Sequence, residues 1–272
     1  MSPVDKLTRP HALDAPARGQ HLAQLYTRDE GLVRVVGDFV MAGLERGEGI
    51  VLIATAAHRA AIARHVEDHG FTPGVLARGR QLTLLDARET LEALRVGAVP
   101  DRARFETVIG GAIEACQRAG FERLRAFVEM VELLRRDKDL EAALHLEGLW
   151  NDLVAGRGLT LLCGHRIDAF DPQAYQGLLQ RVSAVHSHLA PLEDSASLEH
   201  AVECAYLDVF GPGRDAMILR RLFLANYPRP SGMPDAQAAI LAAHEFVPEA
   251  AATLLNRIRH HYHLAHLART AA

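Results

Sequence analysis

The chain has 272 residues, of which 49% are hydrophobic and 24% are charged, and its formal net charge at pH 7 is −4. This length allows a sizeable core, with room for one medium domain and a smaller one. The slight negative charge excludes a general electrostatic affinity for nucleic acids. Three widely spaced cysteines argue against a disulfide framework. No apolar run reaches the roughly 20 residues of a membrane span and no signal core follows Met1, so a cytoplasmic protein is expected.

Strand-length apolar segments alternate with helical patterns through the first two thirds of the chain. Residues 1–20, rich in proline, alanine and charge, are expected to be a flexible lead-in. The expected strands are 21–27, 49–55, 82–86, 124–129 and 159–165. The expected helices are 29–47, 57–69, 89–95, 102–119, 140–158 and 174–188. This alternation predicts an α/β fold of three layers with a mostly parallel sheet, in a domain over residues 21–190.

A helical module is predicted over residues 197–268, after a linker over 191–197. Its expected helices are 198–210, 214–224, 235–246 and 250–267, separated by breaks at 211–213 and 227–234. Such a module suits dimerisation or contact with a partner protein. A DNA-binding helix-turn-helix is an alternative, since three arginines precede or line one helix: Arg214, Arg220 and Arg221.

The stretch 124–166 combines two apolar strands and an intervening helix, as in a parallel βαβ unit. Ligands of open parallel sheets bind at the carboxyl ends of the strands. Four side chains are expected there: Glu129, Cys163, His165 and Arg166. Cys163 is either a small core residue or a ligand-facing thiol, whose pKa a neighbouring imidazolium or Arg166 would lower. His165 lies two residues further, on the same face of the strand.

Other polar residues of the predicted domain have two interpretations each. Tyr26 is expected near the rim at the carboxyl ends of the strands. His21 begins the first strand and so is expected at the opposite end of the strands from Cys163. It would then be a structural residue, unless the chain folds back and brings the two together. Glu129 and Glu132 either cap the following helix or contact a ligand. Three further residues share one helix face: Glu147, Trp150 and Asn151. Trp150 either packs in the core or, together with Glu147, lines an apolar pocket that has one polar group.

A phosphate-binding loop is missing from the sequence between the first strand and its helix. Such a loop needs converging glycines, a lysine and a Ser or Thr. Residues 27–31 read TRDEG, whose two acidic side chains would repel a nucleotide. The glycines of 43–49 (GLERGEG) precede a strand and are best explained as a helix C-cap and turn. ATP hydrolysis of the usual kind is therefore not expected.

Metal binding is the competing hypothesis for the site, although no cofactor is predicted. Cys163, His165 and a carboxylate could supply three ligands for zinc or iron, but the C-x-H pair lacks a second motif of ordinary zinc spacing. In HHYHLAH (260–266) three histidines recur at three-residue steps, which surface histidines on a terminal helix explain as well.

The order HLAQLY, FVMAGLERGEGIVLIAT with HR shortly after, LDA, RAFVEMVELL, LEGLWNDL and LTLLCGH resembles the MEDS family of sensory domains over about residues 20–188. The resemblance implies a RecA/KaiC-like fold without nucleotide-binding signatures, a role in sensing small hydrocarbon derivatives, and attachment to signalling modules. It also implies four functional residues: His21, Glu129, Glu147 and Cys163. Residues beyond 195 lie outside it.

These observations together predict a sensory protein that binds a small organic molecule and relays the signal through the helical module. The partner would be a signalling or transcriptional protein, and the chain could pair as a homodimer. The predicted ligand-binding residues are His21, Tyr26, Glu129, Glu147, Cys163 and His165. A metal-assisted or degenerate nucleotide hydrolase and a non-catalytic scaffold are the alternatives.

Overall fold

The computed structural model describes residues 13, 15–168, 179–190, 192, 195–229 and 233–270. The chain forms two compact units, Met1–Arg166 and Ile167–Ala272. Three parts of the predictions fall outside the described residues: most of the expected lead-in (1–20), the start of the helix predicted at 174–188, and residues 191, 193 and 194 of the expected linker. The sequence-based domain boundary near residue 190 stays a prediction. Among the described helices, none combines the length and apolar character needed to cross a bilayer.

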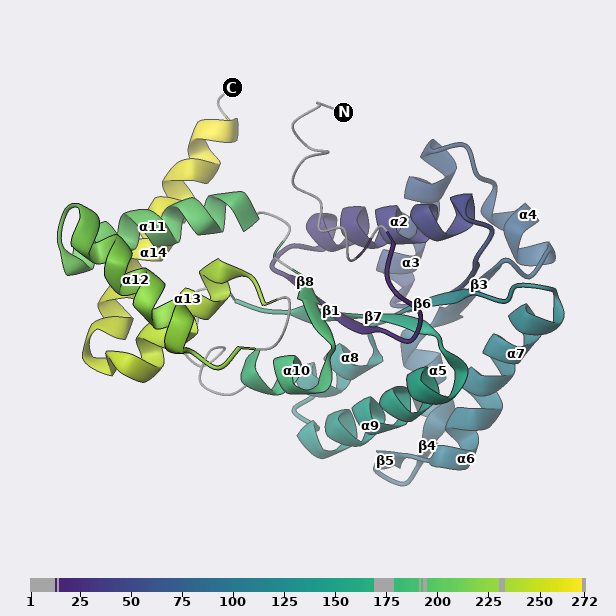
Figure 1. Cartoon of the computed structure of the whole chain (residues 1–272). Coiled ribbons are helices and arrows are strands. Elements are labelled where there is room, and N and C mark those ends of the chain that lie inside the picture. The colour runs from purple at the N-terminus through teal and green to yellow at the C-terminus, as the bar shows by residue number, and fades with distance from the viewer. Residues whose placement is uncertain are drawn as a thin grey trace. The chain divides into compact units, whose positions relative to one another are not determined.

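The first unit is built on a sheet of parallel strands (Figure 1). Its strands are β1 (His21–Tyr26), β2 (Gly49–Ala54), β3 (Leu82–Asp86), β6 (Leu124–Val128) and β7 (Thr160–Arg166), in the spatial order β3-β2-β6-β7-β1. All four neighbouring pairs run parallel. These are the five strands that the sequence predicts. Because helices cover both faces, β1, β2 and β6 are buried along their whole length, which explains their nearly continuous apolar runs.

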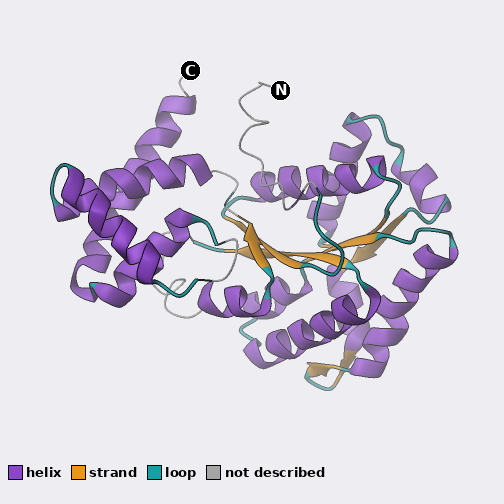
Figure 2. Cartoon of the chain, in the orientation of Figure 1, coloured by secondary structure: helices purple, strands orange, loops and turns teal. Residues whose placement is uncertain are grey.

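Helices lie on both faces of this sheet (Figure 2). One face is covered by α2 (Asp29–Glu45) and α3 (Ala56–Asp68), and the other by α5 (Ala87–Leu94), α7 (Gly111–Arg118), α8 (Met130–Arg136) and α9 (Leu140–Arg157). Elements that the sequence does not predict are α4 (Pro73–Arg78), α8 and a hairpin of β4 (Arg95–Val96) and β5 (Val99–Pro100). The helix expected at 102–119 is divided into α6 (Arg102–Phe105), a π-helical turn (Glu106–Gly110) and α7.

The main core lies between the sheet and α9. The ring of Trp150 packs edge-on against Phe105, with centroids 5.0 Å apart, next to inward side chains of β6 and β7. On the opposite face, buried Arg125 pairs with Glu48 and lies 4.9 Å over the Phe39 ring. The expected three-layer α/β architecture, with a mostly parallel sheet and a C-terminal helical module, is confirmed.

The second unit contains α10 (Leu179–Val185), β8 (His188–Ala190), α11 (Ser195–Phe210), α12 (Arg214–Asn226), α13 (Asp235–Phe246) and α14 (Pro248–Thr270). The last four match the predicted helices. The helix predicted to reach residue 188 instead ends at Val185, and a short strand follows. In the core, the Tyr206 hydroxyl donates to the Ala239 carbonyl at 2.8 Å.

Arg220, one of three arginines considered for DNA contact, is only 8% exposed. Its guanidinium pairs with Glu199 and lies 3.7 Å from Glu203, both on α11. The helix-turn-helix alternative therefore loses this arginine, because its charge is already neutralised inside the unit.

Candidate functional site

Three side chains of types that can bind a metal ion lie together in the core of the first unit. His21 comes from β1, Glu147 from α9 and Cys163 from β7, and they are 3%, 5% and 1% exposed. His21 Nε2 lies 3.1 Å from Cys163 Sγ and 3.6 Å from Glu147 Oε2. One ligand atom from each residue lies within 4.8 Å of the other two. We call these three residues the buried cluster.

The expectation that His21 and Cys163 lie at opposite edges of the sheet is wrong. β7 does not end near Cys163 but continues to Arg166, so the cysteine occupies the middle of the strand. His21 pairs in register with Leu161, and residues two apart share a face of a strand. The side chains of His21 and Cys163 are therefore diagonal neighbours on the face that α9 covers.

Asn151, one helical turn beyond Glu147, holds the imidazole of His21. Its Oδ1 lies 2.7 Å from His21 Nδ1. Since a carbonyl oxygen only accepts, Nδ1 carries the proton and Nε2 presents its lone pair to Cys163. Sequence reasoning placed Asn151 on the same helix face as Glu147 without assigning it this role, because only the fold brings α9 over β1.

Burial dominates the electrostatics of the cluster. It lowers the pKa of His21 to about 4, against a smaller opposing effect of the Asn151 hydrogen bond. It raises the pKa of Glu147 to about 7 and, together with the Glu147 carboxylate, raises the pKa of the Cys163 thiol. The low thiol pKa considered from the sequence is therefore not found, and the thiol donates to a neutral imidazole.

His165 borders the cluster. It is 2% exposed and its Nε2 lies 3.8 Å from Glu147 Oε1. Of the six predicted ligand-binding residues, four thus come together: His21, Glu147, Cys163 and His165.

The other two predicted residues, Tyr26 and Glu129, belong to a second set at the carboxyl ends of the strands. We call Tyr26, Asp29, His58, Glu129 and Arg166 the rim group. Glu129 accepts a hydrogen bond from the Thr55 amide at 2.5 Å and pairs with His58 Nδ1. His58 Nε2 and Arg166 lie 3.5 and 3.2 Å from Asp29 Oδ1.

One expectation about the rim, the capping role of Glu129, is corrected. Glu129 does not cap the helix that follows it, since its side chain makes no capping bond to α8; it binds the amide at the start of α3 instead. Tyr26 is in register with Arg166, one residue beyond His165, so alternation turns it to the opposite face of the sheet. Its ring lies edge-on to His58, with centroids 6.4 Å apart. Burial and nearby carboxylates, Glu132 first, raise the pKa of the Tyr26 hydroxyl.

His58 is a rim residue that sequence reasoning did not single out. The histidine–arginine pair at 58–59 was available as a signal, as part of the family resemblance. The hydrogen bond to Glu129 raises the pKa of this imidazole.

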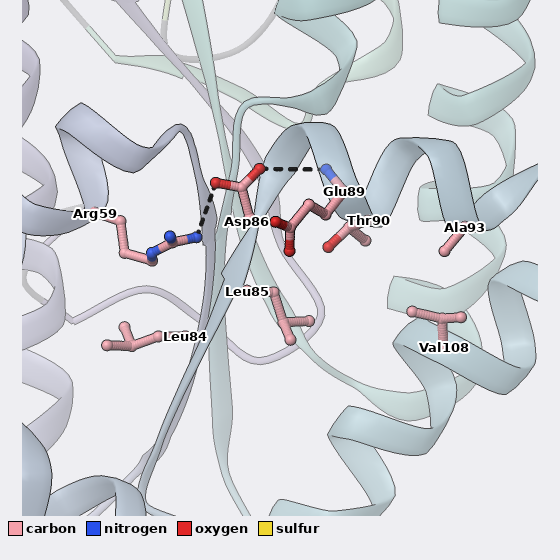
Figure 3. Close-up of a pocket in the computed structure, with 8 residues that line it drawn as sticks. All are labelled: Arg59, Leu84, Leu85, Asp86, Glu89, Thr90, Ala93 and Val108. Carbon is pink, nitrogen blue, oxygen red and sulfur yellow. Dashed lines mark hydrogen bonds and ion pairs between the residues drawn. The ribbon is translucent and has the colours of Figure 1, made fainter.

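A hollow of about 470 Å³ opens at the β3 edge of the sheet (Figure 3). Asp86 is one of its lining residues; it caps α5 through the Arg88 and Glu89 amides and pairs with Arg59 at 3.1 Å. Three strands separate β3 from β1 in the sheet order, so this hollow is distinct from the buried cluster. Its lining is mixed: Arg59, Leu84, Leu85, Asp86, Glu89, Thr90, Ala93 and Val108.

The geometry defines a class: a three-layer α/β domain with a parallel sheet, in which acidic Asp29 and Glu30 occupy the first turn of the helix after β1, where a phosphate loop would be needed. The family model described as MEDS, "MEthanogen/methylotroph, DcmR Sensory domain", matches residues 20–187, so the chain belongs to the MEDS family of sensory domains.

No curated protein matches the sequence. Among solved structures, the chain is similar to a KaiC-like protein from the hyperthermophilic archaeon Pyrococcus horikoshii, with 13% identity and a TM-score of 0.41. The match covers 55% of this chain and 62% of that protein.

Proposed function

We propose that the first unit receives a chemical signal, a small molecule, at the buried cluster, and that the helical unit passes the signal to a partner. The observation that carries this proposal is the convergence of an imidazole, a carboxylate and a thiol in the buried core of the first unit. Burying such polar groups costs more free energy of folding than burying apolar side chains of the same size. Their placement is explained by a binding role better than by stability.

The surroundings of the cluster support this assignment. Its donors come from β1, β7 and α9, three rigid elements, so their geometry is held in advance of binding. His165 stands at the border as a further ligand contact. The residues of the rim group engage one another, and we assign Tyr26 and Glu129 a supporting role that joins the ends of β1, α3 and β6.

The test is a thermal-stability screen of the full chain with one- to three-carbon alcohols, aldehydes, amines and halogenated hydrocarbons. A ligand at 100 times its Kd adds about 2.7 kcal/mol to stability, which raises Tm by a few degrees. We expect one compound class to raise Tm in the wild type and in Cys116→Ala, and not in Cys163→Ala. Cys116 is the matched control, because it is equally buried and lies on α7 next to Thr83. A rise that persists in Cys163→Ala would place the receptor site elsewhere.

A further inference from the structure

We propose that the buried cluster is a binding site for one divalent transition-metal ion of the zinc type, held by His21 Nε2, Glu147 and Cys163 Sγ. This inference rests on the proposed function, since it names the chemistry of the same site. It replaces the sequence-based pair of Cys163 and His165, because the imidazole that lies 3.1 Å from the thiol is that of His21.

Two of the three donor spacings are close to those around a small tetrahedral ion, and the third, between Cys163 and Glu147, is within 4.8 Å. Bonds of about 2.0 to 2.3 Å to nitrogen, oxygen and sulfur place tetrahedral donors about 3.4 to 3.6 Å apart. His21 Nε2 lies 3.6 Å from Glu147 Oε2 and 3.1 Å from Cys163 Sγ. The nitrogen–sulfur contact is a hydrogen bond in the metal-free state, so it needs to open by only about 0.4 Å to admit an ion.

The bond from Asn151 prepares His21 for this role. Metal-binding histidines usually donate their second ring N–H to an outer acceptor, which fixes the tautomer and the ring orientation. The Nδ1 contact with Asn151 Oδ1 has this arrangement, and it leaves the Nε2 lone pair directed at the cluster.

The donor set and its charge select the ion. Sulfur and imidazole nitrogen favour zinc and its neighbours over magnesium and calcium, which prefer oxygen donors. On binding, Cys163 loses its S–H proton to water and Glu147 binds as a carboxylate, so two negative charges balance a divalent cation. A neutral complex is the form that a buried site tolerates best. Three ligands leave one tetrahedral position to a further donor, from the chain or from a bound molecule.

The experiment uses the full chain, freed of metal with a chelator, reloaded with Zn²⁺ and desalted. Elemental analysis is expected to find about one zinc per chain in the wild type and in Cys116→Ala. Loss of the metal is expected in Cys163→Ala, and chelator competition should show at least a tenfold weaker affinity in Glu147→Gln, a variant of nearly the same size. Asn151→Ala should weaken zinc binding 10- to 100-fold.

Co²⁺ provides a measurement that needs no variant. A thiolate ligand gives Co²⁺ a sulfur-to-metal charge-transfer band in the near ultraviolet, which we expect in the wild type. A folded wild type that retains neither ion, or zinc retained equally in Cys163→Ala, would overturn the metal site. A Cys163-dependent Tm rise with an organic compound in chelator would then leave the proposed function standing. Zinc binding without any such compound would support the metal site alone.

Discussion

Glu132 is a buried acid outside the buried cluster, and its ionisation links stability to pH. It is 4% exposed and pairs with Arg135, but burial outweighs this pair and raises the pKa to about 7 from 4.5. An acid whose folded-state pKa is raised stabilises the fold below its unfolded pKa, and the benefit is lost as pH rises through the folded value. A pKa raised from 4.5 to about 7 corresponds to about 3 kcal/mol of unfolding free energy that is lost when the pH rises. Between pH 4.5 and 8, the unfolding free energy of Glu132→Gln should therefore gain about 3 kcal/mol relative to the wild type.

Denaturant titrations at several pH values, with chelator present, measure this difference. Glu122→Gln is the control, because it makes the same chemical change at an exposed glutamate. A difference between Glu132→Gln and the wild type that stays constant with pH would contradict the prediction.

His58 should lose its raised pKa in Glu129→Gln. The carboxylate is the main cause of the raised value, and a neutral amide cannot stabilise an imidazolium to the same extent. Because a base with a raised folded pKa stabilises the fold at low pH, the variant should lose more stability at pH 6 than at pH 9. The total loss should be about 2 kcal/mol, since Glu129 is buried and also binds the Thr55 amide. NMR titration of the His58 ring measures the shift, and an unchanged midpoint would contradict the assignment.

At the residue scale, the sequence identified the chemical groups of the site better than their neighbours. His21, Glu147 and Cys163 were all candidates, yet periodicity placed the end of the last strand at residue 165 and treated the cysteine as its rim. The register of the parallel strands, which pairs His21 with Leu161, determines which side chains lie next to each other. Register depends on contacts between distant segments, so no local pattern predicts it.

At the scale of elements, α2 is the clearest case of a helix packed against the sheet through a glycine. A Cβ built on Gly43 would lie 2.7 Å from Ile50 Cδ1 and 2.9 Å from Arg125 Cδ. Alanine gains about 1 kcal/mol of helix propensity, but overpacking costs about 1 to 3 kcal/mol, and Arg125 is held by several bonds. Gly43→Ala should therefore lower the unfolding free energy by up to about 2 kcal/mol in chemical denaturation.

Gly148→Ala is the matched change on α9. No atom lies within 4 Å of a Cβ at this exposed helical position, so only the propensity gain applies. We expect this variant to be up to about 1 kcal/mol more stable than the wild type. If the two substitutions changed the unfolding free energy equally, the close packing of Gly43 against the sheet would not contribute to the stability of the fold.

The elements that the sequence predicted are those whose pattern is long enough to be read locally. Buried parallel strands and helices such as α2 and α9 repeat their apolar residues over several turns or pairs. The missed ones are short: α4 has six residues, and β4 and β5 have two each. The π-helical turn at Glu106–Gly110 has no periodic signature of its own, so a single helix was expected there.

At the scale of the whole molecule, the family match covers the α/β unit and ends at residue 187, whereas α11–α14 follow it. The proposed relay therefore concerns helices that lie outside the family model. Their core is well formed, with Tyr206, Phe210 and Phe223 in mutual ring contact. A module of this kind can change its packing or pairing between two states, which is what a relay requires.

The proposed relay can be tested by hydrogen exchange. A ligand shifts a conformational equilibrium only if it binds the two states with different affinity, so occupation of the buried cluster should alter amide protection in α11–α14. Adding Zn²⁺ to the chelator-treated full chain should change exchange there by at least several-fold in the wild type and in Cys116→Ala, and leave Cys163→Ala unaffected. If zinc binds and protection changes only within residues 15–168, the helical unit does not receive the signal from the cluster.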